Sequence, residues 1–158
     1  MATRAIDLPS LPREAALAGR LSGRMVGQLA TDEQVLVWAL RQRLHDGAPA
    51  SPVLSHGFRL AFGFGLVEPA LAAFEALFQV LSTAARADLC LCPLRCAFVS
   101  ADEEAILGLV AQARCGLPDT VLRRAGRLVE PDGRAALAER AEMMAALIDR
   151  AGLTGCLN

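Results

Sequence analysis

The sequence predicts an all-α protein, a single-domain bundle of five or six helices. Helix formers dominate the chain, which holds 30 Ala and 26 Leu among its 158 residues. Apolar residues make up 54% of the chain and recur at helical spacing in segments that Gly and Pro separate. At this length we expect one domain over residues 1–158, with residues 1–10 as a flexible N-terminal arm.

The first helix is predicted over residues 12–29 and opens at Pro12. Its i, i+4 rows place Gly19, Gly23 and Gly27 on one smooth ridge. Because each Gly costs a helix roughly 1 kcal/mol relative to Ala, such a ridge indicates close contact with another backbone. We expect helix packing within the chain or an interface with a second copy. The alternative is a break near Gly23 that gives two short helices.

A second helix is predicted from the capping box of Thr31 and Gln34 to the stop at Gly47. Between them the segment is apolar on all sides and carries the single tryptophan, Trp38, so we expect this helix to be central. The residues that follow, 46–57, are rich in Gly, Pro and Ser and predict a loop.

Residues 58–64 alternate apolar side chains with Arg, Ala and Gly, and this period of two predicts a short strand. Pairing of this strand with residues 89–92 would give a two-stranded ribbon beside the helices. The alternative is helical, because Phe58, Phe62 and Leu66 also fit one ridge of a helix.

Three further long helices and a short one after Pro118 complete the predicted bundle. The first of the long helices opens at Pro69, and the next opens at a capping box that begins with Ser100. The last runs from Arg134 to about Ala151. The expected centre of the core consists of large apolar residues from different helices: Trp38, Phe74, Phe78 and Ile106.

Composition and charge exclude several classes of function. The formal charge of −1 argues against a general nucleic-acid binder, because such proteins have a broad basic surface. Lys is absent, which excludes Schiff-base and P-loop chemistry. The most hydrophobic stretch, residues 60–81, contains Glu68 and Glu75 and so does not predict a membrane span. With no apolar signal peptide at the start, we expect a cytoplasmic protein that binds neither nucleic acid nor membrane.

The motif with the most chemical content is Cys90-x-Cys92-Pro93-x-x-Cys96, which places three thiols within seven residues. Three such thiols can converge on one soft metal ion, and His56 is the expected fourth ligand of a Zn site. The same thiols can instead serve as a redox-responsive group. A third interpretation is structural, because a buried free Cys behaves as a small hydrophobe. The spacing alone does not separate these three interpretations.

Catalysis has little support in the sequence. The chain holds two His, and no residue that would orient a Cys–His pair can be named. We therefore expect a non-catalytic role without a cofactor, in which the protein acts through self-association as a homo-oligomer or through docking of a protein partner. The alternative is a metal-binding or redox-sensing module that uses Cys90, Cys92 and Cys96.

Overall fold

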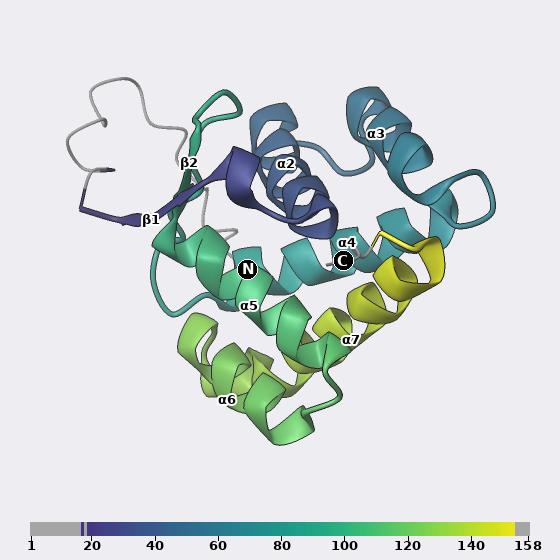
Figure 1. Ribbon diagram of the computed structural model, residues 1–158. Helices are drawn as coiled ribbons and strands as arrows, with labels where there is room; N and C mark the ends of the chain where they lie inside the picture. The colour runs from purple at the N-terminus through teal and green to yellow at the C-terminus, as the bar shows by residue number, and fades with distance from the viewer. Residues whose placement is uncertain (1–16, 18, 154–158) are drawn as a thin grey trace.

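The structure of the protein, a computed structural model, describes Leu17 and residues 19–153. Within this part of the chain, six α-helices and a two-stranded antiparallel ribbon confirm the predicted all-α bundle (Figure 1). The predicted N-terminal arm, residues 1–10, lies outside it. In chain order, the elements are β1 (Leu21–Met25), η1 (Val26–Gln28), α2 (Thr31–Asp46), α3 (Pro52–Phe62), α4 (Val67–Ala84), β2 (Phe98–Ser100), α5 (Ala101–Arg114), α6 (Pro118–Leu128), η2 (Pro131–Gly133) and α7 (Arg134–Ala151).

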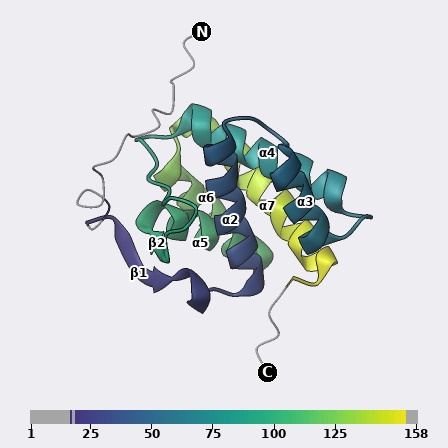
Figure 2. The ribbon, with the colours of Figure 1, turned by 90° about the horizontal axis from the view of Figure 1, so that it is seen from above.

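The central helix of the bundle is α7, whereas the sequence predicts that the helix over residues 31–46 is central. Helix α7 packs against α3, α4, α5 and α6, whereas α2 packs mainly against α3 and α5. In Figure 1, α2 and α3 lie above the layer that contains α4, α5 and α7, and α6 lies below it. Figure 2, seen from above, accordingly has α2 and α3 in front of the other helices. Helix α2 is therefore an outer helix of the bundle.

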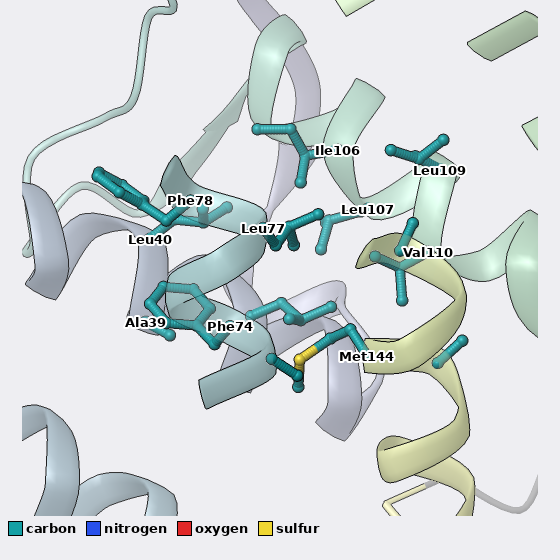
Figure 3. Packing of buried hydrophobic residues seen from close by; sticks show 14 of the residues in the cluster. Ala39, Leu40, Phe74, Leu77, Phe78, Ile106, Leu107, Leu109, Val110 and Met144 are labelled. Carbon is teal, nitrogen blue, oxygen red and sulfur yellow. The ribbon is translucent and has the colours of Figure 1, made fainter. Parts of the chain in front are cut away.

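The core lies where α2, α4, α5 and α7 meet (Figure 3). Phe74 of α4 is fully buried, and its ring lies 5.3 Å from the ring of Phe58 and 6.2 Å from that of Phe78, between centroids. The predicted core positions Phe74, Phe78 and Ile106 are buried as expected. Trp38 is only half-buried and packs at the edge of the core.

A two-stranded ribbon is present, but residues 58–64 and 89–92 do not form it. Strands β1 and β2 pair antiparallel, with Leu21 opposite Ser100. Pairing continues past the strands, since the Ala101 N–H donates to the Arg20 carbonyl at 2.7 Å. The position of the ribbon was predicted wrongly because β1 falls inside the segment assigned to the first helix.

The first helix, predicted over residues 12–29, does not form over Leu21–Gln28, which consists of the strand β1 and the short 3-10 helix η1. Gly23 sits in the middle of β1 with φ +88°, a conformation that an α-helix excludes and that glycine adopts without strain. The ladder is irregular at this point, as expected of a bulge. Gly19, Gly23 and Gly27 therefore form no helical ridge, and a Cβ at any of them would meet nothing within 4 Å.

Helix α3 includes residues for which the sequence predicts other structure: the second half of the predicted loop 46–57 and the predicted strand 58–64 as far as Phe62. Ser51 caps the helix by accepting a hydrogen bond from the Leu54 N–H at 3.1 Å. Phe58 and Phe62 are buried on one side of it, with ring centroids 5.3 Å apart. Apolar residues at i and i+4 fit one ridge of a helix and also fit the alternation of a strand. The strand prediction is wrong because the spacing of Phe58 and Phe62 does not distinguish the two.

The predicted capping box at the start of α5 is confirmed. The Ser100 hydroxyl accepts from the Glu103 N–H at 3.0 Å, and the Glu103 carboxylate accepts from the Ser100 N–H at 2.9 Å. The predicted glycine stops are also confirmed, since Gly47 and Gly152 end α2 and α7 with φ of 66°.

The start of α2 differs from the prediction. The N-cap residue is Ala30, whereas the sequence predicts Thr31 at that position. The Glu33 carboxylate accepts a hydrogen bond from the Ala30 N–H at 2.9 Å. Arg24 of β1 binds the same carboxylate at 2.9 Å and also binds Glu104 of α5 at 2.5 Å. Arg24 thus ties the ribbon to both helices.

The hydrophobic stretch 60–81 is divided between the end of α3 and most of α4, with a turn between them. Among the residues that the structure describes, no helix has both the length and the hydrophobicity needed to cross a bilayer. This agrees with the expectation that the stretch is not a membrane span.

The contact between α2 and α3 can be tested at Gly57. A Cβ there would lie 2.1 Å from Cη2 of Trp38, so Gly57→Ala must displace the indole or separate the helices. We expect the free energy of unfolding, measured by urea titration, to fall by roughly 1–3 kcal/mol. The fluorescence of the single Trp should shift to the red. Gly65→Ala is the control, since a Cβ there meets nothing within 4 Å; equal effects of the two substitutions would contradict this packing.

Candidate functional site

The three clustered cysteines lie on the segment between α4 and β2, which contains no helix. We call residues 88–97 the cysteine loop; in Figure 1 it leads into β2 on the side of the molecule where the ribbon lies. Side chains from α2 and from the start of α5 hold the loop through its backbone: Arg41, Ser100, Asp102 and Glu103.

A buried ion pair between Arg41 of α2 and Glu103 of α5 lies beneath the cysteine loop. The guanidinium donates from Nε to Glu103 Oε1 at 2.7 Å and from Nη2 to Oε2 at 2.9 Å. The two side chains are 3% and 0% exposed. Removing two charges from water costs several kcal/mol for each ion, so every remaining polar atom of the pair needs a partner.

The backbone of the cysteine loop and of β2 supplies those partners. Arg41 donates from Nη1 to the Cys96 carbonyl at 2.7 Å and from Nη2 to the Phe98 carbonyl at 2.6 Å. Glu103 Oε1 accepts from the Cys92 N–H at 3.0 Å. Because buried backbone groups must be paired, the ion pair fixes the path of a segment that has no helix or ladder of its own.

Cys90 has a separate anchor at the N-terminus of α5. Its N–H donates to Asp102 Oδ2 at 2.7 Å, and its carbonyl accepts from the Ser100 hydroxyl at 2.5 Å. Asp102 also stands where the helix dipole favours a negative charge. The first turn of α5 therefore holds the beginning of the loop, while Arg41 holds its end.

The environments of the thiols differ. Cys92 is buried, whereas Cys90 and Cys96 are half-buried. Burial raises the pKa of the Cys92 thiol to about 12, and the charge of Glu103 and a hydrogen bond with the Cys96 thiol contribute to the rise. Burial also raises the pKa of Cys90. Cys90 and Cys92 are therefore protonated at neutral pH, and the thiolate is the form that binds metals and attacks electrophiles.

His56 lies on α3, whereas the three cysteines lie on the loop between α4 and β2. It is exposed on α3, where it borders a groove with Trp38. Within residues 19–153, no group of three or more His, Cys, Asp or Glu side chains is arranged to hold a metal ion. The predicted Zn ligands Cys90, Cys92, Cys96 and His56 are thus not assembled here.

An open groove of about 500 Å³ between α2 and α3 is the second feature of interest. Val35 and Trp38 of α2 form one wall, and α3 forms the other. The lining contains no Asp, Glu, Lys or Arg and consists of Gln34, Val35, Trp38, Val53, His56, Gly57, Leu60 and Ala61. Two of them project strongly into solvent, since Leu60 is 75% exposed and Val53 is 54% exposed.

Helix α3 therefore has two apolar faces. Leu54 and Phe58 point to the core, and Val53, Gly57 and Leu60, spaced i, i+4 and i+7, face the groove. The spacing of Val53, Gly57 and Leu60 is present in the sequence, but the prediction of a loop over residues 46–57 does not use it. The burial of Glu103 against Arg41 has no such signal, because it depends on how α2 packs against α5.

No protein-family model, curated protein or solved structure matches the chain.

The raised pKa of Cys92 predicts how its reactivity depends on pH. The unfolded chain loses this proton near its ordinary pKa of 9.0 and the folded protein near 12, so the thiol's contribution to stability is lost between these values. At about pH 8 we expect iodoacetamide to modify the exposed Cys115 at least roughly tenfold faster than Cys92. Peptide mass mapping measures both rates. Denatured protein is the control, in which the rates converge; equal rates in the folded protein would contradict the burial of Cys92.

Proposed function

We propose that the protein is a non-catalytic docking module that associates with a second copy of itself through the groove between α2 and α3. The observation that supports this most is the exposure of Leu60 and Val53 beside the half-buried Trp38. Apolar surface gains roughly 25 cal/mol for each Å² removed from water, and contiguous exposed apolar patches are typical of interaction sites.

The groove face has both a projecting part and a hollow, which favours a second copy as the occupant. Leu60 and Val53 project from the face, and the groove lies beside them, where the Trp38 ring packs directly on Gly57. In a two-fold dimer the projecting side chains of each copy enter the groove of the other. The lining contains no Asp, Glu, Lys or Arg, so two identical faces do not bring such like charges against each other.

We infer that this association takes place in the cytoplasm and involves neither nucleic acid nor a cofactor. Four free cysteines in the described part of the chain support a reducing compartment, where thiols persist. The formal charge of −1 supports a role without general nucleic-acid binding.

Sedimentation equilibrium of the full chain under reducing conditions tests the proposal. Over a roughly hundredfold concentration range we expect a reversible monomer–dimer equilibrium. Leu60→Glu should weaken dimerisation at least about tenfold, because the interface would bury an unpaired charge. The matched control is Leu117→Glu, at a residue 50% exposed in the turn before α6.

Far-ultraviolet circular dichroism establishes that both variants are folded. A strict monomer at every concentration would refute the proposal. The same follows if Leu117→Glu weakens association as much as Leu60→Glu does, since the groove would then not be the contact.

A further inference from the structure

The cysteine loop contains a turn that relates Cys92 and Cys96, which are four residues apart in the chain. The Cys96 N–H donates to the Pro93 carbonyl at 2.9 Å and closes a turn that folds Cys96 back toward Cys92. The Cys92 N–H binds Glu103 at 3.0 Å, and the Cys96 carbonyl binds Arg41 at 2.7 Å. Since these two partners also bind each other at 2.7 Å, both cysteines are held on one rigid group.

The sulfur atoms of this pair are neighbours as well. The charge of the Cys96 thiolate raises the pKa of Cys92, and both sulfur atoms lie close enough to the Arg41 guanidinium to raise its pKa. Access to them differs, because Cys92 is 1% exposed whereas Cys96 is half-buried and reachable from solvent. A small reagent can therefore reach Cys96 more readily than Cys92.

We propose that Cys92 and Cys96 are an oxidation site, at which a hydroperoxide converts the two thiols into a reversible disulfide. Cys96 is the attacking thiol and Cys92 the resolving thiol. This inference is independent of the proposed dimerisation, because neither cysteine lines the groove.

The chemistry proceeds in two balanced steps. The Cys96 thiolate attacks the peroxide, an S–O bond forms, the O–O bond breaks, and the leaving alkoxide or hydroxide takes up a proton. The Cys92 sulfur then attacks the resulting sulfenic acid, the S–S bond forms, the S–O bond breaks, and water leaves with the Cys92 proton. Two thiols lose two electrons in total, and the peroxide is reduced to an alcohol or water.

The surroundings favour this pair over the two other cysteines that the structure describes. Cys90 has a different anchor, since its N–H donates to Asp102 and its carbonyl accepts from the Ser100 hydroxyl. Cys115 lies beyond the C-terminal end of α5, whereas the loop is held at its N-terminal end. The raised pKa of Cys92 keeps that thiol protonated at neutral pH, so Cys92 is not the thiol that attacks the peroxide first.

The test uses the full chain with Cys115→Ser and Cys156→Ser, so that three cysteines remain. One equivalent of hydrogen peroxide should lower the intact mass by about 2 Da, the two hydrogens lost on disulfide formation, and dithiothreitol should restore it. Trypsin cleaves after Arg86, Arg95 and Arg114. Without reduction, the disulfide should therefore join peptide 87–95 to peptide 96–114.

Fragmentation of the joined peptides identifies the cysteine in 87–95, so the assignment does not depend on the folding of any variant. We expect Cys92, and we expect Cys90→Ser to retain the cross-link while Cys92→Ala abolishes it. A link through Cys90 would overturn the proposal. So would oxidation of Cys96 to the sulfinic acid without loss of 2 Da, or three thiols that stay reduced at one equivalent of peroxide.

Discussion

Arg41 and Glu103 face each other in the interior between α2 and α5, and the non-helical part of the molecule depends on their contact. An apolar pair of similar volume would avoid the desolvation cost of the two charges. It would also remove the partner of the Cys96 carbonyl and leave the Cys92 N–H buried without one, at roughly 1–3 kcal/mol for the buried group. The main contribution of the ion pair is therefore to give the cysteine loop one path, more than to raise overall stability.

This local order extends to the ribbon through Glu103. The same carboxylate caps α5 at Ser100, where β2 ends, and β2 in turn holds β1. Arg24 of β1 then binds α2 and α5 from the outside, through Glu33 and Glu104. The layer of α4, α5 and α7, in contrast, is held by apolar packing around Phe74. The domain thus combines an apolar helical layer with a ribbon and loop that charged side chains organise.

The sequence predicts the elements whose signals are local, and it fails where two patterns compete. The capping box at Ser100 and the stop at Gly47 depend on neighbouring residues alone, and both are confirmed. Strand β1 was missed because Gly23 fits a small-residue helix row as well as a bulge. The cysteines were identified as a motif, but their partner Arg41 lies about 50 residues away, and only the packing of α2 on α5 brings it to them. The groove likewise depends on the close approach of α2 and α3.

Hydrogen exchange of the Cys92 amide tests the central role of the ion pair most directly. This N–H lies in a segment without helix or ladder, yet it should exchange slowly in the wild-type protein because it donates to Glu103. In Glu103→Gln we expect its exchange to accelerate at least about tenfold, while the amides of α7 keep their protection. Glu75→Gln, which alters the more exposed pair with Arg43, is the matched control and should change neither. Unchanged exchange of the Cys92 amide in Glu103→Gln would contradict the role assigned to the pair.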